Sequence, residues 1–347
     1  MFLRNCWYVA AHDRGVGRAL TPTTILDEHI VLFRTADGRP VALEDACPHR
    51  KLPLSKGRLH DAAVECGYHG LAFDGTGHCV AAPTQGNIPP SARVRSYPLV
   101  ERYGMVWIWM GEPEMADPAT IFSVPNDGDP AWGRTHGGVM ELDCNYLYVT
   151  DNLLDPSHVA WVHVSSFAGA GTESQPLKID VSDRGVVVSR WMMDRAPPPY
   201  YGPMLRFSGN CDRLQHYEVV FPSIGVNKSI FTPVGTGGSA EILDPRAFVN
   251  ISYNFITPIT AKRSRYFWYQ HRNTDPLNEE ITRRMDDGAL AAFLEDRDIL
   301  NAVQIGMDEA RTPHLDLGLD AGALRFRRAL QRLIEAEATA RRDSGST

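Results

Sequence analysis

The sequence predicts an α+β protein of two domains, an all-β domain over residues 1–112 and an α+β domain over residues 113–347. The first part alternates short apolar, β-prone runs with turns that contain glycine and aspartate. The second part mixes longer β-prone runs with segments of helical periodicity. A chain of 347 residues, of which 43% are hydrophobic and 22% charged, is long enough for two globular domains.

Short strands are expected throughout the first domain. Residues 1–11 are predicted as a buried first strand, because Arg4 and Asn5 interrupt an apolar stretch that is too short for a secretory signal. The runs 30–34 and 40–45 flank Asp37-Gly38, which predicts a hairpin. Further strands are expected at 71–73, 78–80, 94–100 and 105–110. Such strands favour a small sandwich with loops at its tip.

The second domain is predicted to hold a central antiparallel sheet flanked by helices. Residues 111–130 are rich in proline and aspartate and are expected to link the two domains. The β-prone runs lie at 178–192, 214–221, 226–234, 247–257 and 264–273. Helical patterns cover 150–163, 277–308 and 321–342, and the last is amphipathic and is expected to pack against the domain or a neighbouring subunit.

Composition excludes several classes of protein. The net charge is −7 with no block of lysine and arginine, so nucleic acid is not expected as a partner. No apolar run reaches the roughly 18 residues of a membrane span. The six cysteines show no disulfide-scaffold spacing, which favours reduced thiols in the cytoplasm.

Two Cys/His pairs separated by 16 residues, Cys47-Pro48-His49 and Cys66-Gly67-Tyr68-His69, carry the strongest chemical signal. A Rieske [2Fe–2S] cluster needs two thiolates on one iron and two imidazoles on the other. A tetrahedral zinc site is the alternative, but zinc fingers usually pair cysteine with cysteine and histidine with histidine. Because each loop here supplies one residue of each kind, the spacing favours the Rieske cluster and predicts one-electron transfer.

A second metal site is expected around His158 and His163. Five residues rotate a regular helix by about 140°, so both side chains can meet one metal only if the helix is irregular. Pro156 provides a reason for such a break. Two histidines and one carboxylate form the facial set of non-haem Fe(II). Glu295, Asp296 and Asp298 offer a carboxylate, although an acidic cluster is more often a solvated helix face.

Asp155 lies three residues before His158, on the same side of a helix. One interpretation is that its carboxylate bridges histidines of two metal centres, orienting both and coupling proton and electron movement. The other is a helix-start cap followed by a proline. The co-occurrence of the two metal motifs favours the bridge.

Taken together, the motifs resemble the oxygenase component of Rieske non-haem iron oxygenases over nearly the whole chain. The resemblance is greatest to the group of vanillate O-demethylase, dicamba O-demethylase and toluenesulfonate methyl-monooxygenase. It rests on NCWYVA at residues 5–10, CPHR at 47–50, CGYHGL at 66–71, VWIW at 106–109, and DNLLD at 151–155 leading to His158 and His163.

The resemblance implies a set of roles for these residues. Cys47 and Cys66 would bind one cluster iron, and His49 and His69 the other. His158, His163 and Asp296, with Asp298 as the alternative, would bind the mononuclear iron, and Asn152 would position a ligand or O₂ beside it. It further implies a homotrimer in which an electron leaves His69 and crosses through Asp155 to His158 of the next subunit.

The sequence also departs from the group. Lys51-Leu52 stands where Gly-Ala often follows the first cluster loop, which is expected to alter the surface that meets the reductase. Asn254 stands where the dicamba enzyme carries a substrate-binding histidine, so that pocket does not transfer directly. Candidate substrate-binding groups are Asn254, Asn227, Arg206 and Tyr201, with structural strand residues as the alternative for each.

The predicted function is therefore the oxygenase component of a multicomponent Rieske monooxygenase. With O₂ and electrons from NAD(P)H, delivered by a separate flavin/iron–sulfur reductase, it would oxidise a methyl or O-methyl group of a small, anionic aromatic substrate. The chain itself carries no nucleotide-binding fingerprint. The alternatives are an aromatic-ring dihydroxylating dioxygenase, a Rieske electron-transfer protein without oxygenase activity, and a structural zinc protein.

Overall fold

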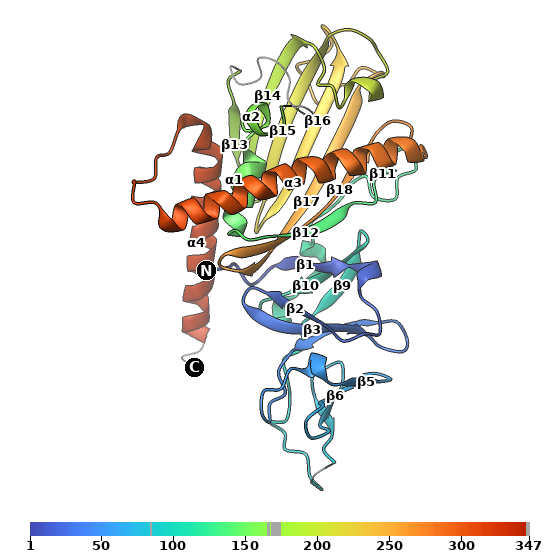
Figure 1. Cartoon of the computed structure of the whole chain (residues 1–347), viewed down its shortest axis with the longest axis vertical. Coiled ribbons are helices and arrows are strands. Elements are labelled where there is room, and N and C mark those ends of the chain that lie inside the picture. Colours follow the sequence, from blue (N-terminus) through green and yellow to red (C-terminus); the bar gives the residue numbers. More distant parts are fainter. Residues whose placement is uncertain (84, 165–166, 168–174, 345–347) are drawn as a thin grey trace. The chain divides into compact units, whose positions relative to one another are not determined.

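The computed structural model describes residues 1–83, 85–164, 167 and 175–344 (Figure 1). The chain divides into two compact units. The first comprises Met1–Ser123 together with Thr257–Ala261, and the second comprises Val124–Ile256 and Lys262–Thr347. No helix of the described residues is long and apolar enough to cross a bilayer.

The first unit consists of three small antiparallel sheets, so the predicted all-β character is confirmed. One sheet has the order β1-β10-β9, with β1 at Trp7–His12, β9 at Leu99–Arg102 and β10 at Met105–Trp109. The second has the order β2-β3-β4 and contains the hairpin predicted around Asp37-Gly38. Its strands are Thr21–Ile25, Glu28–Arg34 and Pro40–Glu44.

The third sheet is built from very short strands and carries the long loops of this unit. It has the order β5-β6-β7-β8, with strands Arg58–His60, Ala63–Glu65, Ala72–Phe73 and Cys79–Ala81. Leu54, Val64 and Phe73 are fully buried in the apolar cluster beneath these loops. This cluster fixes the base of each loop while the loop tips remain at the surface.

The second unit is organised around an eight-stranded antiparallel sheet, which confirms the predicted central sheet and adds two strands, β11 and β12, that were not predicted. Strands β13 to β18 meander in chain order, and β11 and β12 both pair with β18. The predicted single run over 178–192 is wrong, because a turn at 182–184 divides it into two paired strands. The strands are β11 (Gly133–Arg134), β12 (Gly138–Leu142), β13 (Lys178–Val181), β14 (Gly185–Arg195), β15 (Cys211–Val220), β16 (Ile224–Pro233), β17 (Phe248–Thr260) and β18 (Arg263–Arg272).

Within the described residues, four α-helices accompany this sheet. They are α1 (Tyr146–Leu154), α2 (Val159–Val162), α3 (Glu279–Glu309) and α4 (Ala321–Ser344). The long helix α3 crosses the strands of the sheet (Figure 1), and Asn278 caps its start by accepting hydrogen bonds from the N–H groups of Glu280 and Ile281. Amphipathic α4 packs against β14 and α1. Short 3-10 helices lie at Asp13–Gly15, Leu54–Lys56, Pro113–Met115, Pro118–Thr120, Gly202–Met204 and Gly318–Asp320.

Candidate metal centres and substrate cavity

The two Cys/His loops of the first unit share one backbone design. In the first, the Cys47 N–H donates to Leu52 O at 2.9 Å and the Lys51 N–H donates to Cys47 O at 2.8 Å. In the second, the Cys66 N–H donates to Leu71 O at 2.8 Å, and Gly70 closes the same turn onto Cys66 O at 3.1 Å. Two equivalent turns therefore present one thiol each.

The side chains of the two loops lie against one another, cysteine beside cysteine and histidine beside histidine. Cys47 and Cys66 are each 2% exposed, and the rings of His49 and His69 lie 4.5 Å apart between centroids. Nδ1 of His69 is buried and has no hydrogen-bond partner among the described residues. Burial raises the pKa of the Cys47 thiol, and the contact with Cys66 adds to this effect. An orphaned imidazole nitrogen and two buried thiols are what a bound cluster would satisfy, because metal ions stabilise the thiolates.

The departure at Lys51 has a backbone consequence. Lys51 has a φ of +59° and Gly70, its counterpart in the second loop, has +74°. A left-handed conformation favours glycine, so Lys51 adopts it at a cost of about 1 kcal/mol. The Lys51 side chain is exposed, so this departure changes the surface around the cluster site and not the buried residues beneath it.

A break in the helix brings the two histidines of the second unit together. The predicted single helix over 150–163 is wrong: α1 ends at Leu154 and α2 begins only at Val159. Pro156 disfavours helical geometry at Asp155, which adopts an extended backbone with φ −105° and ψ 98°. The interruption that the histidine spacing required is thus present.

Helix α3 supplies the carboxylate. Its buried side chains recur every three or four residues at Met285, Ala289, Ala292, Asp296 and Leu300, so Asp296 occupies a position where a helix normally places an apolar residue. Asp298 instead has an exposed side chain that pairs with Arg297. The acidic cluster is therefore not simply a solvated face.

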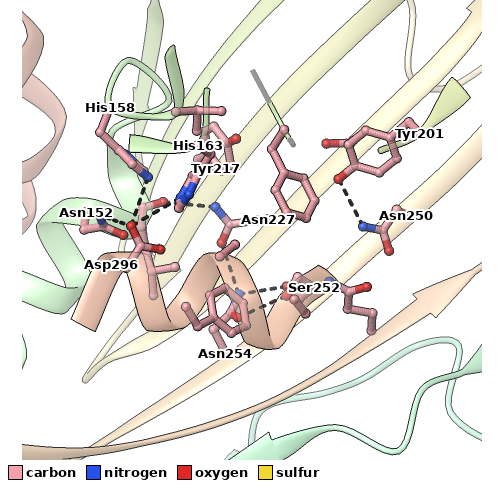
Figure 2. Close-up of a pocket in the computed structure, with 18 of the residues that line it drawn as sticks. Asn152, His158, His163, Tyr201, Tyr217, Asn227, Asn250, Ser252, Asn254 and Asp296 are labelled. Carbon is pink, nitrogen blue, oxygen red and sulfur yellow. Dashed lines mark hydrogen bonds and ion pairs between the residues drawn. The ribbon is translucent and has the colours of Figure 1, made fainter. Parts of the chain in front are cut away.

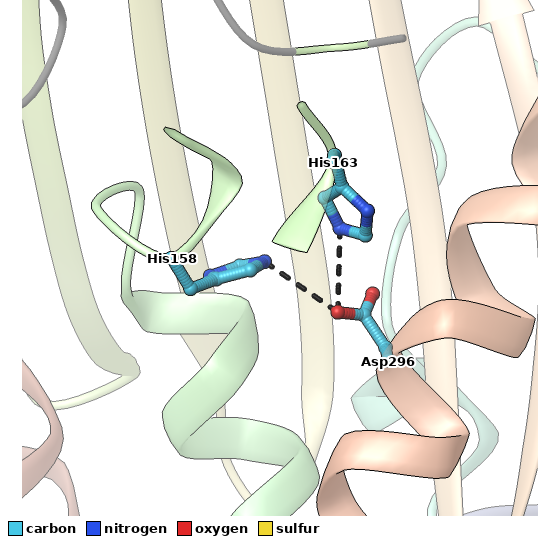
Figure 3. A group of neighbouring side chains, drawn as sticks. All are labelled: His158, His163 and Asp296. Atoms are coloured by element: carbon cyan, nitrogen blue, oxygen red, sulfur yellow. Dashed lines mark ion pairs between the residues drawn. The ribbon is translucent and has the colours of Figure 1, made fainter. Parts of the chain in front are cut away.

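His158, His163 and Asp296 form a compact group in which one atom of each lies within 4.8 Å of the others (Figure 3). Oδ1 of Asp296 is 3.6 Å from Nε2 of His158 and 3.3 Å from Nε2 of His163. Two imidazoles and one carboxylate with free space beside them match the facial donor set of non-haem Fe(II). These three residues could hold such an ion.

The remaining ring nitrogens of both histidines have partners. Nδ1 of His158 contacts the backbone oxygen of Asp155, and Nδ1 of His163 lies 2.7 Å from Oε2 of Glu295. These acceptors leave Nε2 of each ring available as a ligand. Burial lowers the pKa of His158, which favours the neutral, metal-binding imidazole. Burial also acts on His163, but the carboxylates of Asp296 and Glu295 outweigh it and raise its pKa in the metal-free protein.

The structure places the two remaining predicted residues of this centre next to it. Asn152 on α1 donates from Nδ2 to Oδ1 of Asp296 at 3.1 Å and so orients the carboxylate. The carboxylate of Asp155 accepts the N–H groups of Ser157 at 2.7 Å and His158 at 3.2 Å, which is the capping interpretation of this residue. A bridge to a second histidine stays a prediction.

A cavity extends from this group across the sheet (Figure 2). The predicted residues Tyr201, Asn227 and Asn254 line it. Arg206 does not: its side chain is 47% exposed and lies 4.0 Å from Asp275. The basic residue that lines the cavity is Arg213 on β15. Helix α3 and a preceding loop supply apolar walls through Phe167, Ala289, Ala292 and Phe293.

Asn254 and Asn227 are engaged with the protein itself. The Asn254 amide donates to Gly225 O and to Oδ1 of Asn227, and its Oδ1 accepts from Tyr266 at 2.8 Å. Nδ2 of Asn227 donates to Leu153 O at 3.3 Å. The alternative interpretation, structural polar groups of the strands, therefore describes much of their hydrogen bonding, although both remain at the cavity wall.

The sequence offered Glu295 only as one of three carboxylates for the metal, not as a partner of a histidine, and it gave Arg213 no role. Glu295 directly precedes the carboxylate of the centre, and a metal-binding histidine usually donates its second N–H to a carboxylate or carbonyl. That rule could have directed attention to Glu295. Nothing in the sequence distinguishes Arg213 from Arg206; the structure places Arg213 on β15 at the cavity and Arg206 in the loop before this strand.

Comparisons with known proteins match a family model to each part of the chain. Residues 6–98 match the family model of the Rieske [2Fe-2S] domain, and residues 142–336 match that of the vanillate O-demethylase oxygenase C-terminal domain. The first match contains Cys47, His49, Cys66 and His69. The second contains the histidine–aspartate group and the cavity.

Several relatives match over almost the full length. A putative iron–sulfur subunit of a toluene-4-sulfonate monooxygenase system from Comamonas testosteroni is 37% identical, over 97% of this chain and 98% of the relative. A vanillate O-demethylase oxygenase subunit from Pseudomonas is 34% identical over 97% and 96%. A solved dicamba monooxygenase with bound 3,6-dichlorosalicylic acid superposes with a TM-score of 0.89 at 31% identity, covering 97% of this chain and 99% of that one. The chain thus belongs to the Rieske non-haem iron oxygenases, as an oxygenase component of the vanillate O-demethylase type.

Proposed function

We propose that this chain oxidises a methyl or O-methyl group of a small aromatic acid, as the oxygenase component of a multicomponent monooxygenase. The observation that carries the proposal is the continuity of the cavity with the His158–His163–Asp296 group. The relatives are named for vanillate, dicamba and toluene-4-sulfonate, each of them an aromatic acid with a methyl or methoxy substituent.

The residues of the metal centre would bind the iron and orient its ligands. His158, His163 and Asp296 would bind Fe(II), which supplies O₂ activation at its open positions when it is bound. Asn152 keeps the Asp296 carboxylate turned toward the histidines. Asp155 and Glu295 fix which ring nitrogen of each histidine is protonated. The apolar wall around Phe293 excludes water from the face on which the aromatic ring would lie.

The net reaction consumes the substrate, O₂, two electrons and two protons, and it yields the hydroxylated product and water. A hydroxylated ring methyl is a benzylic alcohol. A hydroxylated O-methyl group is a hemiacetal that collapses to a phenol and formaldehyde. The protein contributes placement of the C–H bond, which alone can supply several orders of magnitude in rate.

Electrons would reach the chain from a separate flavin/iron–sulfur reductase and leave the cluster through His69. His49 is exposed and His69 partly so, and exposed histidines suit contact with another protein. We place Asp155 between His69 of one subunit and His158 of the next in a homotrimer. Its side chain is 23% exposed, so it can reach a neighbouring subunit. The six cysteines, none of them in a disulfide, fit a reducing cytoplasm.

The test is a coupled assay with purified holoprotein, a Rieske-oxygenase reductase and NADH. It should use methoxy- and methyl-substituted benzoates and toluene-4-sulfonate. We expect oxygen uptake with formation of formaldehyde or a benzylic alcohol. A cis-dihydrodiol would instead assign the chain to ring dihydroxylation. If the cluster is reduced but none of these compounds gives a product, the chain would be assigned as an electron-transfer protein without oxygenase activity. The His158→Ala variant gives the baseline without the mononuclear site.

A further inference from the structure

The floor of the cavity is a grid of side chains on one face of the sheet. Alternate residues of a strand point to the same face, and the register aligns Arg213 with Phe231, Gln215 with Ser229, and Tyr217 with Asn227. The next strand continues these rows with Phe248, Asn250 and Ser252. The position of a residue along β15 therefore fixes how far it lies from the metal end.

Arg213 stands at the end of this grid away from the metal centre. Asn227, in the row of Tyr217, contacts the helix that carries Asn152, and Arg213 lies four residues, about 13 Å, further along the strand. Its guanidinium lies over the rings of Phe231 and Tyr201, at 5.2 and 5.9 Å from their centroids. Figure 2 shows Tyr201 and Asn250 at the opposite side of the cavity from His158, His163 and Asp296.

No carboxylate of the described part of the chain forms an ion pair with this buried guanidinium. Arg213 is 3% exposed, and its Nε and Nη1 atoms have no hydrogen-bond partner among the described residues. Asp212 does not neutralise it, because this carboxylate points to the other face and accepts the N–H groups of Asp194, Gly235 and Gly237. The single carboxylate in the described lining is Asp296, at the far end.

A second buried arginine, on the neighbouring strand β14, does form hydrogen bonds to protein oxygens. Arg190, which is 4% exposed, donates from Nε to Oε1 of Gln215 at 2.7 Å and from Nη2 to Pro156 O at 3.0 Å. Burying a charge without such partners costs several kcal/mol unless a bound ion supplies them. At Arg213 the cavity leaves room for that ion, and the planar guanidinium suits bidentate contact with a carboxylate or sulfonate.

We infer that Arg213 binds the acidic group of the substrate and thereby directs the opposite end of the aromatic ring toward His158, His163 and Asp296. This inference rests on the proposed function and narrows it to aromatic acids in which the oxidised methyl or methoxy group lies across the ring from the acid. Asn227 and Asn254, whose amides are engaged with the protein, form the wall beside the ring and not the anion site.

The experiment measures binding by calorimetry in the holoprotein with two matched pairs of probes: 4-methylbenzoate with 4-methylbenzamide, and toluene-4-sulfonate with toluene-4-sulfonamide. We expect wild-type protein to bind each acid about 10- to 100-fold more tightly than its neutral partner, as hydrogen bonds to a charged group imply. Arg213→Gln should abolish this preference. Arg206→Gln, which removes the same charge from an exposed site, should preserve it.

Equal affinity for acid and amide in the wild type, or an acid preference that survives in Arg213→Gln, overturns the inference. If thermal unfolding shows that Arg213→Gln does not fold, Arg213→Lys with the same probe pairs replaces it, and a smaller acid preference is then expected. Binding and turnover separate the two proposals. Acids that bind through Arg213 but give no oxidised product refute the proposed function alone, whereas oxidation with no acid preference refutes the role of Arg213 alone.

Discussion

Nδ1 of His163 lies 2.7 Å from Oε2 of Glu295, and Nε2 of the same ring lies 3.3 Å from Oδ1 of Asp296. Two consecutive residues of α3 thus hold the two nitrogens of one imidazole. The His163 side chain is 5% exposed while that of Glu295 is 41% exposed, so the pair links the buried centre to the protein surface. Such outer contacts set the orientation and basicity of a metal-binding histidine.

Replacing Glu295 should weaken iron binding without unfolding the protein. Glu295→Gln removes the charge that faces Nδ1 of His163, and loss of such a partner typically lowers metal affinity 10- to 100-fold. Titration of the apo mononuclear site with Fe(II) measures the effect. Glu309→Gln, an exposed carboxylate on the same helix, serves as the control. Equal affinities in the two variants would show that the contact has no influence on the metal.

The choice between the two aspartates can be tested by iron content. Asp296→Asn should lose about one third of the iron, because the mononuclear ion leaves and the [2Fe–2S] cluster stays. Asp298→Asn should keep full iron content, since its side chain is exposed and paired with Arg297. Iron and sulfide analysis with the electron paramagnetic spectrum of the cluster measures both. Full iron in Asp296→Asn would exclude this carboxylate as a ligand.

Asp155→Asn should retain both metal centres and lose nearly all NADH-coupled turnover. An asparagine oxygen can still accept the N–H group of Ser157, the shorter of the two contacts, so the turn between α1 and α2 should persist. The negative charge needed to bind protonated N–H groups of two histidines is gone. Stopped-flow reduction should show a cluster that accepts electrons at the wild-type rate but passes them on slowly. Normal turnover would refute the bridge between subunits.

His271 should make the protein less stable in acid. It is 1% exposed, neither ring nitrogen has a partner among the described residues, and burial, with the nearby Arg134 charge, lowers its pKa to about 4. Between the unfolded value of 6.5 and about 4, the unfolded state binds more protons, so stability falls as the pH falls. At about 1.4 kcal/mol per pH unit, the loss reaches about 3 kcal/mol and is complete below pH 4.

Denaturant unfolding of wild type and His271→Gln between pH 7 and pH 4 measures this loss. The difference between the two proteins isolates His271, because other acid-sensitive groups are common to both. The variant should lose less stability than the wild type over this interval. His60→Gln, at an exposed site, should follow the wild-type curve. Parallel curves for all three proteins would contradict the expected contribution.

Local sequence signals predicted the fold where one short stretch decides the structure. Asp37-Gly38 specifies the β3–β4 hairpin, and alternating strands specify the large sheet. They failed at 150–163, because the helical pattern of the sequence continues across Asp155 and Pro156, whereas the helix itself is interrupted there. The spacing of His158 and His163 had already indicated a break, because two residues five apart on a regular helix do not lie on the same face.

The candidate site was predictable as far as its motifs are local. His158, His163 and Asp296 follow from spacing and family resemblance, and the structure brings them together. Glu295 required knowledge that α3 passes beside a histidine 132 residues earlier in the chain. The choice of Arg213 over Arg206 required knowing where β15 begins, since Arg213 lies on this strand and faces the cavity, whereas Arg206 lies in the loop before it.

The metal group and the cavity floor come from different parts of the second unit. Helices α1 to α3 and the turn after α1 carry the former, and alternate positions of β15, β16 and β17 carry the latter. Substitutions on the cavity floor can therefore change which aromatic acid binds, while the residues of the metal group stay the same. We therefore expect substrate choice and metal binding to respond to separate sets of substitutions.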